Sequence, residues 1–401
     1  MESSALRYRV MAAGVMCVLL TIGIGRFAYT PLLPVMQEQT GLGLSRGGWL
    51  AAVIYMGYLA GALLASQITS LRTKDRFYRI ALILGVLSTL GMALSDNFWL
   101  WVFFRFLAGL SGTAGMIISA ALILHWLVQH GFRGELGIHY GGVGLGVVIV
   151  TLVIESMSAY FDWREQWLGL TLLSMVLAVL AWVWLPSPDT EKPVAKQQTQ
   201  DHPPSPLFFR LFLAAYCCAG VGYVVSVTFI VAIIDGLPGM EGKGGLGFLV
   251  MGLAAAAGAF LWDRVARSIG YFASLSAAAL LQIAGILLPV MMPSLPFVLL
   301  GCVLFGATFI GLVSLVLTMS GHYFPTRPAK MMGKMSVAYG VAQIVGPAVT
   351  GIIAEYTGNY NVGLYMAALV MVVGLCLFIL LKYLDTKEDR QIDEIAAYSA
   401  R

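Results

Sequence analysis

The sequence predicts an all-α membrane protein whose twelve transmembrane helices form two pseudo-symmetric six-helix bundles. Of the 401 residues, 59% are hydrophobic and only 11% are charged, whereas soluble domains carry about 25% charged residues. Apolar runs of about 20 residues or more follow one another along the chain, without the alternation typical of membrane strands. Sequence features also recur at equivalent runs of the two halves, which indicates a duplicated unit.

Each apolar run is long enough to cross a hydrocarbon layer of about 30 Å as a helix that rises 1.5 Å per residue. The predicted spans cover about residues 9–36, 45–68, 78–95, 98–126, 137–160, 165–186, 207–235, 244–263, 270–292, 296–319, 331–354 and 361–384. The stretch 186–206 is rich in Pro, Lys and Gln and has no apolar periodicity. We therefore expect an N-terminal bundle in residues 1–185, a cytoplasmic linker in 186–206, and a C-terminal bundle with its tail in 207–401.

The distribution of positive charge predicts the topology. Of the 24 lysines and arginines, Arg26 and Arg105 lie deep within predicted spans, and the others lie in connections or within a few residues of a span end. Arg46, Arg164 and Lys243 fall in one set of alternate connections, and all the others fall in the set that includes both termini. Because cytoplasmic loops carry the excess of Lys and Arg, both termini are predicted to be cytoplasmic.

The two halves repeat each other in detail. Asp75, Arg76 and Arg79 after the second span are answered by Asp263, Arg264 and Arg267 after the eighth. Around the fifth and eleventh spans, three residues recur at an offset of 200: Gly146 with Gly346, Glu155 with Glu355, and Tyr160 with Tyr360. Agreement in span number favours a duplicated six-helix unit over chance.

The segments that carry these charges resemble motifs of the major facilitator superfamily. Leu71 to Arg79 is similar to the cytoplasmic motif after the second span, Asp263 to Arg267 to its second copy, and Arg105 to Gly109 to the arginine-glycine motif of the fourth span. Leu71 and Tyr78 stand where the first motif usually has glycine. The fifth span lacks the glycine-proline pair that many antiporters carry, which weighs against a drug antiporter.

A narrower resemblance rests on the first two spans. The run GIGRFAYTPLLP from Gly23 to Pro34, together with Tyr55 to Gly61, is similar to the YbfB/YjiJ-like branch of bacterial transporters. The resemblance implies rocking between two bundles around a central site, and a location in the bacterial cytoplasmic membrane. It says little about the substrate.

Two arginines within spans are the strongest site candidates, because a charged group in the bilayer needs a partner, a water-filled cavity or a ligand. Arg26 lies about 16 residues into its span, roughly 24 Å from the inner edge, and Arg105 about 7 residues, roughly 10 Å, below the outer edge. The two depths are similar. Since the resemblance implies that both spans line the cavity, the guanidinium groups are predicted to meet one carboxylate, sulfonate or phosphate. For Arg26 the alternative is a structural partner such as a helix-end carbonyl or Glu155. For Arg105 a structural or proton-handling role comes first, because the superfamily motif that it resembles is widespread, and substrate binding is the alternative.

The C-terminal half offers no matching charge, because Cys302 and Gly306 occupy the positions equivalent to Arg105 and Gly109. A cationic N-terminal half and a neutral C-terminal half fit a small amphiphilic anion whose body lies against aromatic rings. The predicted substrate contacts beside the arginines are Tyr29, Tyr55, Tyr58, Tyr216, Tyr223, Tyr339 and Gln343, and Gln282 is a further cavity candidate. Packing or interfacial roles are the alternatives for the tyrosines.

Carboxylates are scarce within the spans. Glu155, Glu355 and Asp235 lie near predicted outer ends, where they are candidates for solvated side chains. Glu155 is nevertheless the candidate for proton coupling, since an acid that faces an arginine can exchange partners when protonated. A transporter of lipophilic cations would be expected to carry a carboxylate near the midplane, so its absence disfavours cation efflux.

Polar groups near the predicted cytoplasmic ends have other expected roles. Asp75, Arg76, Arg79, Asp263, Arg264 and Arg267 are gating candidates, with a plain topological role of the arginines as the alternative. His125, His130 and His139 flank the connection between the fourth and fifth spans and are read as interfacial, with pH sensing as the alternative.

Several function classes are not expected. The sequence shows no phosphate-binding loop, no HExxH and no catalytic triad in a soluble domain, so no enzyme, catalytic residue or cofactor is predicted. The five cysteines lie in apolar runs without metal-ligand spacing, so no metal site is expected. The net charge of +4 reflects topology and not nucleic-acid binding.

These observations predict a secondary transporter that moves a small organic anion, bearing a carboxylate group, by proton symport and alternating access. Its partners are the substrate, protons and the lipid bilayer, and it is expected to be monomeric. Efflux of drugs or metabolites is one alternative. A membrane sensor that kept the fold without the flux is another.

Overall fold

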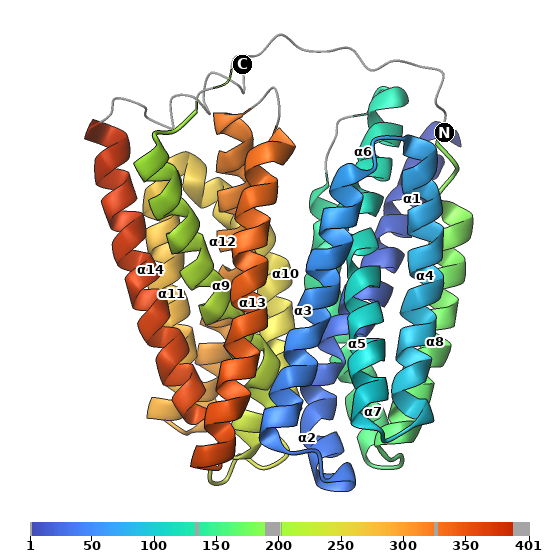
Figure 1. The fold of residues 1–401 in the computed structure, drawn as a ribbon, viewed down its shortest axis with the longest axis vertical. Coiled ribbons are helices and arrows are strands. Elements are labelled where there is room, and N and C mark those ends of the chain that lie inside the picture. The colour runs from blue at the N-terminus through green and yellow to red at the C-terminus, as the bar shows by residue number, and fades with distance from the viewer. Residues whose placement is uncertain (1, 133–135, 189–200, 202, 325–327, 388–401) are drawn as a thin grey trace.

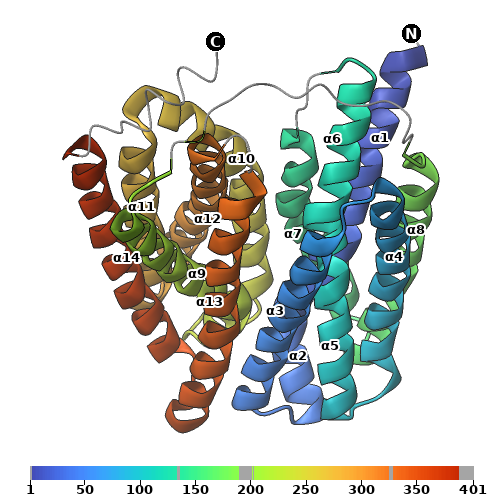
Figure 2. The ribbon, with the colours of Figure 1, turned by 45° about the horizontal axis from the view of Figure 1, so that its top comes forward.

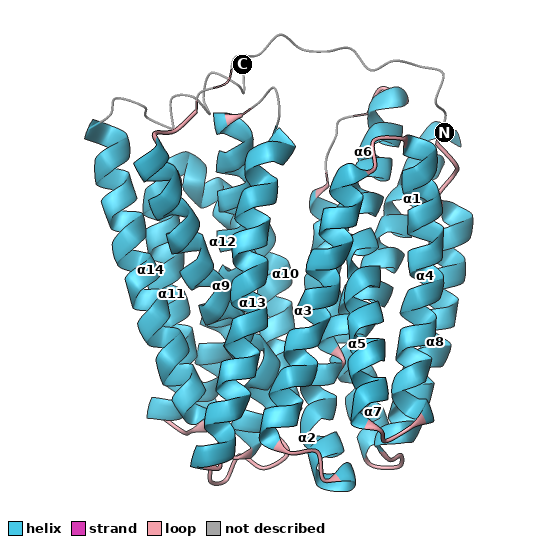
Figure 3. Ribbon diagram, viewed as in Figure 1, coloured by secondary structure: helices cyan, strands magenta, loops and turns pink. Residues whose placement is uncertain are grey.

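The computed structural model describes residues 2–132, 136–188, 201, 203–324 and 328–387, and every regular element in these ranges is a helix (Figure 3). The N-terminal half contains α1 (Glu2–Val18), η1 (Leu19–Phe27), α2 (Tyr29–Thr40), α3 (Leu44–Gln67), α4 (Leu71–Leu94), α5 (Phe98–Thr113), η2 (Ala114–Ile118), α6 (Ser119–Gln129), α7 (Gly137–Ser158) and α8 (Trp163–Trp184). The C-terminal half contains α9 (Pro206–Asp235), α10 (Gly244–Ile269), α11 (Tyr271–Met291), α12 (Leu295–Tyr323), α13 (Pro328–Thr357) and α14 (Asn361–Lys387). Elements η1 and η2 are π-helical.

The expected number of spans is confirmed for the described residues. Eleven continuous helical segments are long and apolar enough to cross a membrane, and α10 supplies a twelfth although it bends by 49° between Gly258 and Leu261. The first span joins α1, η1 and α2, and the fourth joins α5, η2 and α6. Most of the predicted linker, residues 189–200 and 202, lies outside the described residues.

Local signals explain several helix starts. Asp162 and Glu165 form a capping box at the start of α8, and the Asn97 side chain accepts hydrogen bonds from the first backbone N–H groups of α5. Ser205 caps α9, whose first residue is Pro206. One predicted boundary is wrong: the third span was expected from residue 78, but α4 begins at Leu71. The charged segment 71–79 is therefore the first two turns of a helix.

The helices separate into two groups, α1 to α8 and α9 to α14, in both views of the fold (Figures 1 and 2). The first turn of α1 and the last turn of α14 lie at the same end of the molecule, here the termini end (Figure 1). The ribbons of the two groups lie farther apart there than at the opposite end.

Contacts between the halves concentrate toward the opposite end. The backbones of α3 and α13 touch at Gly48 and Gly351, where a Cβ on Gly351 would lie 2.9 Å from the Gly48 Cα. Gln37 of α2 donates to the Tyr360 hydroxyl at 2.8 Å, and the backbone N–H of Ser45 donates to Glu355 at 3.0 Å. The structure is thus closed at the opposite end and splayed at the termini end.

Candidate functional site

Arg26 lies in the last turn of the π-helical segment η1. The backbone N–H of Ala28 bonds to the carbonyl of Gly23, five residues earlier, at 3.1 Å. Gly23 and Gly25 weaken the preference for α-helix, and Pro31 removes a donor in the next turn, so departure from α geometry costs little here. Such π segments often mark functional positions.

The Arg26 guanidinium is surrounded by aromatic rings from both halves. Its Cζ lies 4.7 Å from the ring centroid of Tyr55 on α3, 5.0 Å from that of Tyr223 on α9 and 5.2 Å from that of Phe27. It donates a hydrogen bond to the Tyr223 hydroxyl. These cation–π contacts favour the positive charge. They do not neutralise it.

Arg26 has no carboxylate partner among the described residues, whose ion pairs join Asp75 to Arg79 and Asp263 to Arg267. Its Nε is buried without a hydrogen-bond partner. The expected alternative partner Glu155 is not paired with it. A guanidinium in this setting retains donors for an incoming anion.

Tyr223 begins an aromatic wall in the C-terminal half. Its ring stacks on Tyr339 at 6.0 Å, Tyr339 stacks on Tyr216 at 4.5 Å, and Phe309 lies 5.0 Å from Tyr223 on the other side. Phe305 continues the wall, 5.6 Å from Phe309. The three tyrosines were predicted as site residues. The two phenylalanines were missed, although their i,i+4 spacing on α12 places both on one helix face.

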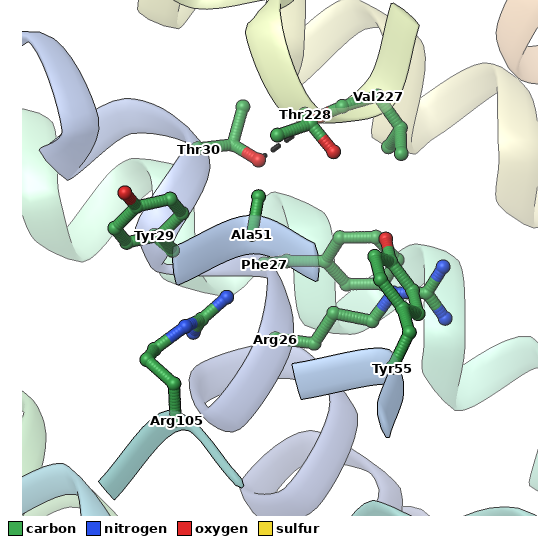
Figure 4. A pocket seen from close by; sticks show the side chains of 9 residues that line it. All are labelled: Arg26, Phe27, Tyr29, Thr30, Ala51, Tyr55, Arg105, Val227 and Thr228. Carbon is green, nitrogen blue, oxygen red and sulfur yellow. Dashed lines mark hydrogen bonds between the residues drawn. The ribbon is translucent and has the colours of Figure 1, made fainter. Parts of the chain in front are cut away.

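Two small pockets of about 10 Å³ each flank Arg26. The first is lined by Arg26, Phe27, Tyr29, Thr30, Ala51, Tyr55, Arg105, Val227 and Thr228 (Figure 4). The second is lined by Thr21, Ile22, Arg26, Ile54, Tyr55, Tyr58, Ala108, Gly109 and Gly112. Each volume is about the room that a single water molecule needs. Thr30, which sequence reasoning missed, donates to the Val227 carbonyl at 2.9 Å across the two halves.

Arg105 borders the first pocket, and two of its N–H groups donate to backbone carbonyls. Its Nε donates to the Leu50 carbonyl at 3.2 Å and its Nη1 to the Gly25 carbonyl at 3.0 Å. Its Cζ lies 4.3 Å from the ring centroid of Tyr29, and its exposed fraction is 2%. These contacts match the structural alternative that the sequence left open. A direct substrate contact of Arg105 stays a prediction.

The remaining predicted contacts divide by position. Tyr29 borders the first pocket and donates to the Gly47 carbonyl at 2.9 Å, while Tyr58 borders the second pocket. Gln343 is buried on α13, four residues beyond Tyr339. Gln282 on α11 is fully buried, and neither of its amide atoms has a hydrogen-bond partner.

Glu155 lies at the end of α7 and faces the start of α10. A Cβ on Gly245 would lie 1.6 Å from Glu155 Oε1, so the carboxylate is in contact with that glycine. Asp235 accepts from the Gly244 backbone N–H at 2.7 Å, which brings a second carboxylate to the same helix start. Glu155 therefore faces an acid and a helix N-terminus, and no arginine pairs with it among the described residues.

The predicted gating clusters form equivalent pairs within each half. Arg79 bonds to Asp75 at 3.1 Å and also donates to the carbonyls of Trp182 in α8 and of Leu185 directly after it. Arg267 bonds to Asp263, four residues earlier, while Arg76 and Arg264 are exposed. The shared i,i+4 pattern matches the sequence repeat. No ion pair between the halves occurs in the described part of the chain.

Comparison with known proteins identifies the family. Residues 18–379 match the model of a family described as uncharacterised MFS-type transporter YbfB. The chain belongs to this family of major facilitator transporters. It is a multi-pass membrane protein, and both its family and its relatives are transporters and not enzymes.

Two relatives match over almost the whole chain. The uncharacterised MFS-type transporter YceJ of Bacillus subtilis is 22% identical and is aligned over 90% of this chain and 93% of its own length. The probable sulfoacetate transporter SauU of Cupriavidus necator is 26% identical, over 92% and 93%. A crystal structure of the nucleoside transporter NupG superposes with a TM-score of 0.75 at 14% identity, covering 94% of this chain and 99% of that one, which shows a shared fold.

Proposed function

We propose that this major facilitator transporter moves a small organic anion, with the carboxylate or sulfonate head on Arg26 and the body against the aromatic wall. The observation that carries the proposal is a guanidinium between the two halves, surrounded by Tyr55, Phe27 and Tyr223, with no carboxylate partner among the described residues. An unneutralised buried charge is costly unless a ligand compensates it. An anion would do so.

Three further observations support this substrate class. The pockets beside Arg26 are small. The described spans bring no carboxylate to Arg26, so a lipophilic cation would find a positive group in place of a counter-charge. The relative from Cupriavidus necator is named for sulfoacetate, an anion with one sulfonate and one carboxylate.

The remaining parts of the proposal concern orientation and mechanism. The excess of Lys and Arg supports a cytoplasmic termini end, and with that orientation the present state, splayed at the termini end, would be inward-facing. Alternating access would close the termini end and open the opposite end around Arg26. The protein would work as a monomer in the cytoplasmic membrane and move protons with the anion.

A thermal-unfolding experiment on the purified full-length protein tests the site. The panel contains sulfoacetate, its dicarboxylate analogue malonate, benzoate, and the lipophilic cation tetraphenylphosphonium. A ligand that binds only the folded state at 100 times its Kd adds about 2.7 kcal/mol to the free energy of unfolding. We expect at least one anion to raise the melting temperature of the wild-type protein. The same anion should not raise the melting temperature of Arg26→Gln.

The comparison uses the ligand-induced shift, because removal of a buried charge changes the stability of the free protein as well. Arg164→Gln, which removes an exposed arginine, is the matched control and should keep the wild-type shift. Stabilisation by tetraphenylphosphonium alone, or by anions equally in wild type and Arg26→Gln, would contradict the proposal and favour efflux of cationic compounds.

A further inference from the structure

One titratable side chain is buried in the N-terminal half away from Arg26. His139 was read from the sequence as interfacial, but the structure corrects this: its exposed fraction is 1%. It lies in the first turn of α7 and packs against η2, α6 and α1. Gly14 of α1 makes room for it, since a Cβ there would lie 2.5 Å from His139 Nδ1.

The hydrogen bonds of His139 identify its protonation state. Its Nε2 lies 3.0 Å from the Gly115 carbonyl oxygen, which can only accept, so Nε2 carries the hydrogen. Its Nδ1 is buried and has no partner. A neutral imidazole fits, because it leaves a bare acceptor at Nδ1. An imidazolium would place an N–H donor where the described residues offer no acceptor, which is costly.

Among the described residues, no charged side chain forms a hydrogen bond or ion pair with His139. The titratable groups around His139 are of types that are neutral near pH 7. Tyr140 lies beside it on α7, with the two rings 5.1 Å apart. Cys17 of α1 lies within reach of the Ser119 hydroxyl, and Tyr78 of α4 lies within reach of Cys17. Ser119 Oγ itself lies 3.5 Å from His139 Nε2. Protonation of His139 would therefore add an uncompensated charge to this state.

A short path of contacts joins His139 to Arg26. Gly115, whose carbonyl His139 bonds, belongs to the π segment η2. Gly115 packs on Thr21 of the other π segment η1, because a Cβ on Gly115 would lie 2.1 Å from Thr21 Oγ1. Thr21 lines the second pocket together with Arg26, five residues further along η1.

We propose that His139 is the proton-binding residue of the transport cycle. It is neutral in the present state, and proton addition to Nδ1 favours the alternative state in which the termini end closes. The proton reaches Nδ1 from water on one side of the membrane and leaves Nδ1 to water on the other side. The hydrogen bond from Nε2 to the Gly115 carbonyl transmits the change in protonation through η2 to η1 and Arg26. The inference rests on the proposed anion transport for its coupling, but not for its pH response.

The geometry favours His139 over the other ionisable groups. Arginine does not lose its proton in this pH range, which excludes Arg26 and Arg105. Glu155, Asp235 and Glu355 lie where the halves meet at the opposite end. Among these described groups, His139 is the one that combines an imidazole, which can accept a proton at Nδ1, with a path of contacts to the pocket.

A ligand-free measurement tests the pH response. Spin labels on the exposed positions Ser70 and Ser268, in a background whose accessible native cysteines are replaced by serine, report the distance between the halves at the termini end. We expect the wild-type distance to shorten between about pH 8 and about pH 5. His139→Gln, which keeps an N–H donor but cannot titrate, should hold the long distance at both pH values.

His130→Gln is the matched control, because His130 lies in the same inner region but bonds only to its own helix, at the Trp126 carbonyl. It should respond as wild type does. His139→Asn is the second variant in case His139→Gln does not fold. A wild-type distance that does not respond to pH, or an equal response in the His139 variants, would overturn the proposal.

A transport assay in proteoliposomes separates this proposal from the proposed function. With labelled sulfoacetate, His139→Gln should lose at least tenfold in uptake driven by a proton gradient, but exchange of internal for external sulfoacetate, which needs no net proton movement, should stay within twofold of wild type. Loss of both activities in His139→Gln with a normal fold would contradict a coupling role. Absence of exchange in wild type would contradict sulfoacetate as substrate and leave the spin-label result to decide on His139.

Discussion

Two arginines within the membrane spans show how neighbouring atoms decide the role of one residue type. Arg105 is held by the carbonyls of Leu50 and Gly25 and by the ring of Tyr29. Arg26 has aromatic rings and one hydroxyl around it, and its Nε is unpartnered. Arg105 thus directs two of its N–H groups at backbone carbonyls, whereas the Nε of Arg26 is buried without an acceptor, which is why Arg26 is the proposed anion site.

Replacement of Arg105 should therefore reduce stability more than it changes substrate recognition. Arg105→Gln leaves two buried carbonyls short of a charged donor, and hydrogen bonds to charged groups contribute about 1.5–3 kcal/mol each. We expect a clear fall in the melting temperature of the purified protein while the anion-induced shift persists. Arg164→Gln, on the surface, should leave the melting temperature near that of wild type.

Loss of the anion-induced shift in a folded Arg105→Gln protein would instead support a direct substrate contact, as the sequence predicts. In Arg26→Gln the anion-induced shift itself should disappear. The two variants together therefore separate a structural arginine from a binding arginine.

At the scale of the elements, small residues bring α3 and α5 into backbone contact. A Cβ on Gly109 would lie 1.8 Å from the Ile54 carbonyl oxygen, and a Cβ on Gly57 would lie 2.0 Å from that of Phe106. These helices carry Tyr55, Tyr58 and Arg105, so their close approach sets the width of the site. Small residues permit this approach where lipid gives helices little hydrophobic drive to associate.

Gly109→Ala should consequently separate α3 from α5. Because the obstructing atom is backbone, it cannot move aside as a flexible side chain would. We expect poor folding yield or a strongly lowered melting temperature in detergent. Gly112→Ala on the same helix is the control, since its Cβ would meet Ile22 Cδ1 at 3.4 Å, an ordinary contact. Equal stability of the two variants would show that α3 and α5 can part at little cost.

At the scale of the whole molecule, the two halves hold one of at least two arrangements. They meet toward the opposite end through Gly48 and Gly351. Ser45 also bonds to Glu355 of α13, and Gln37 bonds to Tyr360, which directly precedes α14. Alternating access requires these contacts to break and contacts at the termini end to form. A substitution that acts only on the first set should shift the population.

Gly48→Ala is such a substitution. Its Cβ would lie 2.5 Å from the Pro347 carbonyl oxygen of the other half, so the closed opposite end is penalised while neither half is disturbed internally. We expect a shorter distance between spin labels on Ser70 and Ser268. Gly340→Ala, whose Cβ would meet only Leu59 Cδ1 at 3.6 Å, should keep the wild-type distance. A longer or unchanged distance in Gly48→Ala would refute the expected shift.

The sequence by itself determined the fold, because bilayer thickness and the need to satisfy every backbone group leave few solutions for twelve long apolar runs. It also marked Arg26, since a charge in an apolar run is conspicuous. It did not reveal the π segments, because their backbone hydrogen bonds span five residues where those of an α-helix span four. It did not reveal the burial of His139 either, because His139 is next to a polar connection in the sequence. Only the tertiary structure separated Arg26 from Arg105 and joined His139 to the site, because partners distant in sequence decide whether a buried polar group is satisfied.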